Sequence, residues 1–111
     1  MKVSDKLIKL LRHHEGVRNK PYQCPAKLWT VGVHKMLPNV PLRQHEFDGL
    51  ISFCFNLGLG CFQRSTIRQA LLRGDKEAAM ESLVKYCRAG GKILKGLQNR
   101  RLDERKLFLG L

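Results

Sequence analysis

The sequence predicts a mainly α-helical protein of the α+β class with one small β segment. Three observations lead to this prediction. Apolar residues recur at helical spacing from Leu42 to Leu57. Cap residues and glycines divide much of the rest into short helices. Only the run Trp29–Val33 is rich in β-formers. With 111 residues we expect one domain, 1–111, in which an N-terminal segment, 1–40, precedes a helical part, 41–111.

The N-terminal part is expected to begin with a helix. Ser4 is a candidate N-cap, and the apolar stripe that follows it runs to about His14. Gly16 then ends this helix. Residues 29–33 are predicted to form a short strand, and residues 34–41, which carry two prolines, are predicted to form a loop.

The helical part begins with the strongest helix, residues 42–57, whose apolar face is wide enough to be nearly surrounded by other elements. Gly58 and Gly60 mark its end. Ser65 and Asp75 are candidate N-caps of two further helices. We expect these two to reach Arg73 and Cys87, and a last helix to run from about Leu97 to Leu109.

The charge balance limits the partners that the chain can bind. The formal net charge is +12, which favours polyanions such as nucleic acid, an anionic membrane surface or the acidic bacterial wall. No helix-turn-helix, zinc-finger or aromatic RNA-binding pattern is present, so no specific nucleic acid is expected. Asp5 and Lys6 interrupt any signal-peptide core, so we expect synthesis in the cytoplasm without a signal peptide.

The cysteines and histidines do not predict a metal site. The cysteines form no Cys-x-x-Cys pair, which argues against structural zinc. Those at positions 54, 61 and 87 are expected to be small packing residues. The histidine spacing fits no standard site, so we expect surface histidines, no metal and no organic cofactor.

Glu15, Cys24 and Thr30 form the candidate catalytic set. A glycosidase needs a proton donor for the leaving oxygen and a second group that attacks the sugar or activates water. Glu15 follows a predicted helix and has apolar neighbours that would favour its protonated form. Cys24, nine positions later, is interpreted as either the nucleophile or a water holder, and Thr30 as the residue that orients the water.

This segment resembles the active-site motif of the bacteriophage-type lysozymes, glycoside hydrolase family 24, in which Glu, Asp or Cys, and Thr follow one another at this spacing. Residues 44–53, 55–62 and 89–101 resemble later segments of the same family. The resemblance implies a lysozyme-like helical lobe with a reduced β segment. It also implies a muramidase that cuts β-1,4 bonds between N-acetylmuramic acid and N-acetylglucosamine in peptidoglycan, made in a host bacterium and acting on the wall after release. The candidate substrate-binding residues are Tyr22, Trp29, Asn56, Arg100 and Arg101.

The sequence departs from the family in length. Family members are about half as long again, and the missing residues fall between Val33 and Pro41, so the resemblance implies an internal deletion there. The apolar face left uncovered predicts repacking or a homodimer. Retention and inversion of the anomeric configuration both stay open, because Cys24 occupies the position at which the family often has Asp. The alternative function is an inactive, lysozyme-derived cationic protein that binds the wall or an anionic membrane.

Overall fold

The computed structural model describes residues 9, 23–89 and 91–111. Its helices are α2 (Gln23–Met36), α3 (Gln44–Leu57), α4 (Leu59–Gln63), α5 (Thr66–Leu72), α6 (Lys76–Leu83) and α7 (Lys95–Phe108). The short strands β1 (Arg88–Ala89) and β2 (Lys92–Ile93) form one hairpin. The predicted mainly α class is confirmed. Apart from Lys9, the helix expected from Ser4 to His14 lies outside the described residues.

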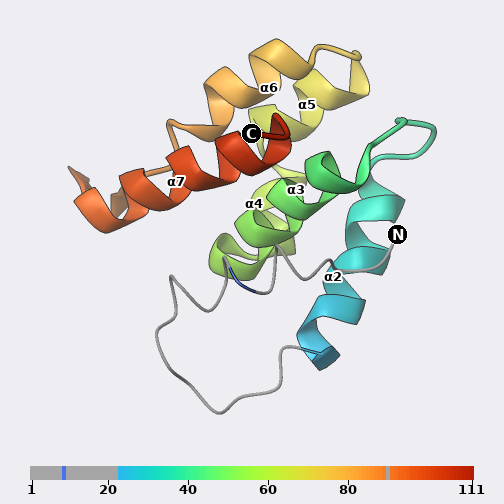
Figure 1. The fold of residues 1–111 in the computed structure, drawn as a ribbon, viewed down its shortest axis with the longest axis horizontal. Helices are drawn as coiled ribbons and strands as arrows, with labels where there is room; N and C mark the ends of the chain where they lie inside the picture. Colours follow the sequence, from blue (N-terminus) through green and yellow to red (C-terminus); the bar gives the residue numbers. More distant parts are fainter. Residues whose placement is uncertain (1–8, 10–22, 90) are drawn as a thin grey trace.

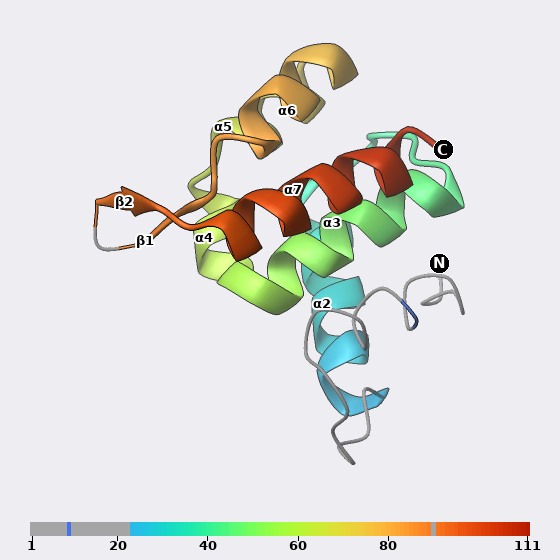
Figure 2. The same ribbon diagram turned by 60° about the vertical axis from the view of Figure 1, so that its left-hand side comes forward.

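Helices α3 and α7 form the centre of the molecule. They run antiparallel and side by side (Figures 1 and 2), and α3 makes its most extensive contacts with α7. Helix α2 packs against α3, α5 pairs with α6, and α4 connects the end of α3 to this pair. All nine residues from 46 to 54 of α3 are buried. The expectation that other elements nearly surround this helix is therefore confirmed.

Helix α3 forms where the apolar spacing predicted it. Phe47, Leu50, Ile51 and Cys54 recur at intervals of three and four, and none of their side chains is exposed. Gly58 then takes a φ of 90°, and its N–H donates to the carbonyl of Cys54 at 2.8 Å. Glycine adopts this backbone conformation without a Cβ penalty, so the helix ends here as predicted.

The two predicted N-caps are also confirmed. The Ser65 hydroxyl accepts a hydrogen bond from the N–H of Arg68 at 3.1 Å. The Asp75 carboxylate accepts one from the N–H of Ala78 at 3.0 Å. Each cap satisfies a backbone N–H that has no partner within its own helix, and so fixes where α5 and α6 begin.

The prediction of a strand at residues 29–33 is wrong, because these residues lie within α2. The loop prediction for 34–41 also fails in part, since α2 continues to Met36. Val33 and Leu37 are buried against the core, and Met36 is packed on it, so the apolar residues here repeat with helical spacing. This burial outweighs the β-preference of the Trp-Thr-Val run, because β-propensity depends on context. Pro25 is tolerated because it lies in the first turn.

The segment after α6 differs from the prediction in three ways. Helix α6 ends at Leu83 rather than near Cys87, and α7 begins at Lys95 rather than near Leu97. Between them the chain forms the β1–β2 hairpin, which was not predicted. Cys87 is buried and its carbonyl accepts from the N–H of Leu94 at 3.0 Å, so the chain leaves the helix to close the hairpin. Two-residue strands are too short to show an alternating pattern.

Gly49 allows the close approach of α3 and α7. A Cβ there would lie 3.0 Å from the Glu104 carbonyl oxygen and 3.0 Å from Cβ of Phe108. We therefore expect Gly49→Ala to lower the free energy of unfolding by about 1–2 kcal/mol, because overpacking costs more than the roughly 1 kcal/mol of helix propensity that alanine gains. Urea unfolding would measure the change.

Gly96 supplies the matched control for this prediction. It lies in the first turn of α7, and a Cβ there would meet no other atom within 4 Å. Gly96→Ala is expected to leave stability unchanged or to raise it by up to about 1 kcal/mol. Equal effects of the two substitutions would contradict the assigned role of Gly49.

Candidate functional site

The predicted catalytic residues and two of the predicted substrate-binding residues belong to the N-terminal part of the sequence. Glu15 and Tyr22 are outside the described residues, and Cys24 and Trp29 are described only as backbone positions of α2. Thr30 is a half-buried residue of the same helix. A helix rises about 1.5 Å per residue, so the backbones of Cys24 and Thr30 are about 9 Å apart along its axis. The two residues therefore come from different turns of one helix, and not from a loop and a strand.

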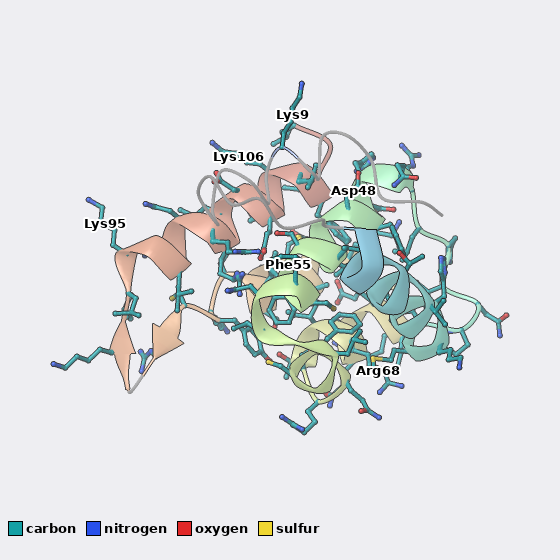
Figure 3. The ribbon with its side chains drawn as sticks, turned by 90° about the horizontal axis from the view of Figure 1, so that it is seen from below. Lys9, Asp48, Phe55, Arg68, Lys95 and Lys106 are labelled. Carbon is teal, nitrogen blue, oxygen red and sulfur yellow. The ribbon has the colours of Figure 1, made fainter. Side chains whose placement is uncertain are left out.

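Three of the predicted substrate-binding residues meet at the α3–α7 contact. Asn56 comes from the last turn of α3, and Arg100 and Arg101 come from α7. The guanidinium of Arg101 donates to the side-chain oxygen of Asn56 at 2.9 Å. Phe55, labelled in Figure 3, lies on the same end of α3, with the guanidinium carbon of Arg100 5.9 Å from its ring centre. The structure thus brings together residues that are 45 positions apart in the sequence.

Glu104 is the centre of this cluster, which we call the Glu104 cluster: Ser52, Asn56, Arg100, Arg101 and Glu104. The Glu104 side chain has no exposed surface. One carboxylate oxygen accepts from the Ser52 hydroxyl at 2.6 Å, from Nη2 of Arg101 at 3.0 Å and from Nε of Arg100 at 3.3 Å. The other oxygen lies 2.7 Å from Nε of Arg101, a close ion pair without hydrogen-bond alignment. Both oxygens are therefore matched by positive charge.

Arg101 is fully buried and its guanidinium contacts several groups of the protein. It has no exposed surface, and its guanidinium carbon lies 5.0 Å from the ring centre of Phe53. Nη1 donates to the carbonyl of Tyr86 at 3.4 Å, in addition to the contacts with Asn56 and Glu104. A side chain with no exposed surface cannot reach a glycan directly. Arg101 can act on a substrate only through the residues that it positions, and Asn56 is one of them.

Arg100 lies at the margin of the cluster. Its residue surface is 4% exposed, and Nη2 donates to the backbone carbonyl of Ser52 at 3.3 Å. The cluster contains two guanidiniums for one carboxylate, so it carries a net positive charge. This charge lies next to the half-buried Asn56. Asn56 is the one member of the cluster that is partly exposed, so a polar ligand could meet the cluster there, with the buried arginines holding the Asn56 side chain in place.

The electrostatics of the cluster depend on mutual compensation. Burial raises the pKa of the Glu104 carboxyl, and the guanidinium of Arg101 opposes this shift. Burial also lowers the pKa of Arg101, and Glu104 opposes that shift in turn. Each group offsets the desolvation of the other, so the removal of either one would leave a buried charge without its partner.

Ser52 and Glu104 were missed as functional candidates from the sequence. Glu104 is three positions after Arg101 and four after Arg100, and such pairs lie on one face of a helix. This spacing, together with the buried Leu107 and Phe108 on the same helix, could have indicated an inward-facing charged cluster. Ser52 gave no comparable signal, because a serine within an apolar helix commonly bonds its own backbone.

A concave region lies at the other end of the α3–α7 pair, away from the Glu104 cluster. It is a hollow of 620 Å³ between the start of α3, α6 and the end of α7. His45 and the carbonyl of Phe108 are joined by a 2.7 Å hydrogen bond at its edge. Its lining mixes both signs of charge with apolar groups: Arg43, His45, Glu46, Lys76, Glu77, Met80, Glu81, Arg105, Phe108 and Leu109. This mixture does not favour one class of ligand.

Glu46 in this hollow is expected to make stability depend on pH in the acid range. Burial alone would raise the pKa of Glu46, but the N–H of Arg43 at 2.8 Å and the ammonium of Lys76 outweigh it and hold the pKa below its ordinary value of 4.5. A lowered pKa in the folded state means that this stabilisation is present above about pH 4.5 and is lost as the pH falls through the folded value.

We therefore expect Glu46→Gln to lower the free energy of unfolding at neutral pH by about 1 kcal/mol. The half-exposed Lys76 keeps the loss small, because water screens its charge. Near pH 3 the difference between parent and variant should shrink, which urea unfolding at the two pH values would measure. Glu81→Gln, an exposed acid that lines the same hollow, is the control. A difference that stayed constant with pH would contradict the role given to Glu46.

Neither a metal-binding cluster nor a membrane-spanning helix is present among the described residues. No group of three His, Cys, Asp or Glu side chains in that part of the chain could hold a metal ion. None of the described helices is long and apolar enough to cross a membrane.

Comparison with known proteins places this geometry in a family. The phage lysozyme family model matches residues 32–104, so Glu15, Cys24 and Thr30 all lie before the matched region. An endolysin of Bacillus phage B103 is 31% identical over 144 residues, which cover 98% of this chain and 54% of the relative. An endolysin of Acyrthosiphon pisum secondary endosymbiont phage 1 is 32% identical over 143 residues, which cover 97% of this chain and 98% of the relative. The chain therefore spans about half the length of the Bacillus phage protein.

Solved structures show the same fold. P22 lysozyme superimposes with a TM-score of 0.81 at 25% identity, over 98% of this chain and 99% of that one. The muramidase domain of SpmX from Asticaccaulis excentricus has a TM-score of 0.81 at 24% identity, over 97% of both chains, which is a likeness of fold. With a family match over about two thirds of its residues and a 32%-identical endolysin aligned over nearly its whole length, the chain belongs to the phage lysozyme family.

Proposed function

We propose that the chain is an endolysin-type muramidase that hydrolyses the β-1,4 bonds between N-acetylmuramic acid and N-acetylglucosamine in bacterial peptidoglycan. The observation that carries this proposal is the similarity to phage endolysins over 97% of the chain, which includes the Glu15, Cys24 and Thr30 motif. The fold shared with P22 lysozyme supports it, because the two chains match over nearly their whole lengths.

In the proposed reaction Glu15 donates a proton to the glycosidic oxygen as the bond to the sugar breaks. A water molecule, oriented by Thr30, supplies the hydroxyl that replaces the leaving group, and its remaining proton passes to the Glu15 carboxylate or to solvent. Cys24 either holds this water or attacks the sugar first and is then released by water. The first route inverts the anomeric centre and the second retains it, so the configuration of the first product would decide between them.

The Glu104 cluster has a supporting part in this proposal. Asn56 and Arg100 are proposed to contact the glycan, Asn56 because it is half-buried and Arg100 through the 4% of its surface that is exposed. Arg101 is proposed to act as a positioning residue, because it is fully buried and bonds the Asn56 side chain. Tyr22 and Trp29 complete the proposed substrate-binding set from the N-terminal side.

The deletion between Val33 and Pro41 is part of the proposal. The alignment with the endosymbiont phage endolysin extends over 143 positions, which exceeds the 111 residues of this chain, so the relative has residues that this chain lacks. A homodimer through the face that this deletion would uncover is also part of the proposal. Light scattering that gives a monomer mass at assay concentration would exclude the dimer.

The experiment that tests the function is a count of reducing sugar ends. Purified peptidoglycan is incubated with the protein at low salt, and a heat-inactivated sample is the control. New reducing ends that increase with time would support a glycosidase. The alternative is a cationic protein without turnover, favoured by the +12 charge. Protein that sediments with the wall, releases no new ends and dissociates when salt is raised would support this alternative instead.

The proposed site of synthesis is the cytoplasm of a host bacterium, from which the protein reaches the wall after release. The named endolysin relatives support this order of events. Fractionation of host cells before and after lysis would test it, since protein found outside the membrane before lysis would contradict a cytoplasmic origin.

A further inference from the structure

The orientation of the Asn56 side chain is determined by its partner. Nη2 of Arg101 donates to Oδ1 of Asn56 at 2.9 Å. A carboxamide has one oxygen that accepts hydrogen bonds and one NH₂ group that donates them, whereas a guanidinium has N–H donors and no acceptor. The oxygen of Asn56 must therefore face Arg101, because the reverse orientation would place donors against donors.

Arg101 is in turn fixed by other contacts. Its side chain has no exposed surface, and its Nε lies 2.7 Å from a carboxylate oxygen of Glu104. Nη1 donates to the carbonyl of Tyr86 at 3.4 Å. Because these partners hold the other nitrogens of the guanidinium, Nη2 stays directed at Asn56 and Glu104. The amide of Asn56 is thus oriented by a buried residue before any ligand arrives.

The group of Asn56 that remains for a ligand is the NH₂ group. It branches from the amide carbon away from Oδ1, and so away from Arg101. Within the described part of the chain, its nitrogen donates no hydrogen bond to another protein group. Asn56 is half-buried, whereas the other members of the Glu104 cluster are buried. The cluster therefore presents an oriented hydrogen-bond donor at its one partly exposed residue.

We infer that Asn56 is a specificity residue that recognises an acceptor oxygen of the glycan, either the carbonyl of an N-acetyl group or a carbonyl or carboxylate of the attached peptide. This inference rests on the proposed function, which supplies the ligand, and it names the chemical group that Asn56 recognises. A sugar hydroxyl in the same place could accept from the NH₂ group, but its own hydrogen would then need a second partner. An amide or carboxylate oxygen carries no such hydrogen.

The charge behind Asn56 favours the same class of ligand atom. The cluster holds two buried guanidiniums for one carboxylate. The oxygen of a carbonyl or carboxylate is the negative end of its group, so this net positive charge attracts it. Charge and hydrogen-bond geometry therefore both point to an acceptor oxygen.

Asn56→Asp reverses the polarity of the exposed group with little change of shape. One carboxylate oxygen can keep the bond to Arg101, and the charge strengthens that bond. The other oxygen then replaces the NH₂ group, and it accepts hydrogen bonds but cannot donate them. The variant should therefore unfold at a temperature no lower than that of the parent and yet lose its recognition of acceptor oxygens. A purely structural role for Asn56 would not separate stability from binding in this way.

The test is calorimetric binding of the whole chain to three soluble ligands at about 0.15 M salt, where long-range attraction is largely screened. The first is a β-1,4-linked hexamer of N-acetylglucosamine. The second is cellohexaose, which has a hydroxyl in place of each acetamido group. The third is the disaccharide of N-acetylglucosamine and N-acetylmuramic acid with its peptide. The variants are Asn56→Asp and Asn56→Ala, and the control is Asn99→Asp, which makes the same change at an exposed position of α7. Thermal unfolding of each variant accompanies the binding.

We expect the parent to bind an acetylated ligand at least about tenfold more tightly than cellohexaose, the ratio that corresponds to about one well-formed hydrogen bond. Asn56→Asp should remove this preference, Asn56→Ala should reduce it, and Asn99→Asp should keep it. A preference for the hexamer that Asn56→Asp removes assigns the acceptor to the N-acetyl group. A preference that appears only with the disaccharide peptide assigns the acceptor to the peptide.

Four results would overturn the inference. The parent could bind both acetylated ligands no better than cellohexaose. Asn56→Asp could keep the parental preference. Asn99→Asp could lose the preference equally, which would indicate a general effect of charge. Asn56→Asp could unfold at a lower temperature than the parent, which would mean that its carboxylate does not replace the amide oxygen at Arg101.

Failure of this inference and failure of the proposed function are distinguishable. A parent that releases reducing ends from peptidoglycan but shows no preference would refute the role of Asn56 alone. A parent that shows the preference, loses it in Asn56→Asp and releases no reducing ends would support recognition by Asn56 and refute hydrolysis.

Discussion

Replacing Glu104 with glutamine is expected to lower the free energy of unfolding by about 3–5 kcal/mol. The side chain has no exposed surface and contacts both Arg100 and Arg101. Glutamine keeps the volume but removes the negative charge, so two buried guanidiniums would lose their compensation. A typical domain has only about 5–15 kcal/mol of stability in total, so this one substitution should remove a large part of it.

Urea unfolding of parent and variant at neutral pH would measure this loss. Glu81→Gln is the matched control, because Glu81 is an exposed acid of α6, and it should change stability by less than about 0.5 kcal/mol. A further variant separates charge from shape: Arg100→Met, Arg101→Leu and Glu104→Leu together should recover much of the loss, since apolar residues can replace buried ion pairs at little cost. A loss of under about 1 kcal/mol for Glu104→Gln would show that the cluster is more hydrated than its burial indicates.

The fold could be predicted where sequence pattern and tertiary burial agree. Helix α3 has helical apolar spacing, a glycine at its end and other elements on most sides, and the sequence alone located it within two residues. The caps Ser65 and Asp75 could be predicted equally well, because N-capping is a local interaction between residues three positions apart.

The fold could not be predicted where distant contacts decide the local structure. Residues 29–33 have strand-forming side chains but form a helix, since Val33 and Leu37 are buried against the core. The hairpin had no detectable pattern because each strand has only two residues. Its position depends on Cys87 and Leu94 closing its base, an interaction that appears only in the folded chain.

The candidate site, too, could be predicted only in part. Asn56, Arg100 and Arg101 were identified by the resemblance to a family, and the structure brings them together. Their partner Glu104 was not identified, although its spacing from the arginines is regular. The sequence analysis expected Arg100 and Arg101 to meet the substrate, whereas in the structure Arg100, Arg101 and Glu104 are all buried. Charged residues are rarely fully buried unless they are paired. Composition alone therefore predicts that the charged side chains of such a helix face solvent.

Glu15→Gln is expected to reduce the release of reducing ends from purified peptidoglycan by about 10²–10⁴-fold, the contribution that a positioned proton donor usually makes. Glutamine has nearly the shape of glutamate but cannot transfer a proton to the glycosidic oxygen. Binding of the protein to intact wall should remain close to that of the parent, because one charge in a protein of net charge +12 changes the overall attraction little.

Activity and the urea midpoint, measured on the same variants, distinguish a loss of catalytic chemistry from a loss of structure. Glu104→Gln should reduce activity and lower the urea midpoint together, because it disturbs the packing of α7 on α3. Glu15→Gln should abolish activity while the urea midpoint stays within error of the parent, and Glu81→Gln should change neither. If Glu15→Gln released reducing ends at the parental rate, another group would have to protonate the leaving oxygen, and the assignment of Glu15 would be wrong. If it lost activity and stability in proportion, its effect would be structural, and the proton donor would again have to be sought elsewhere.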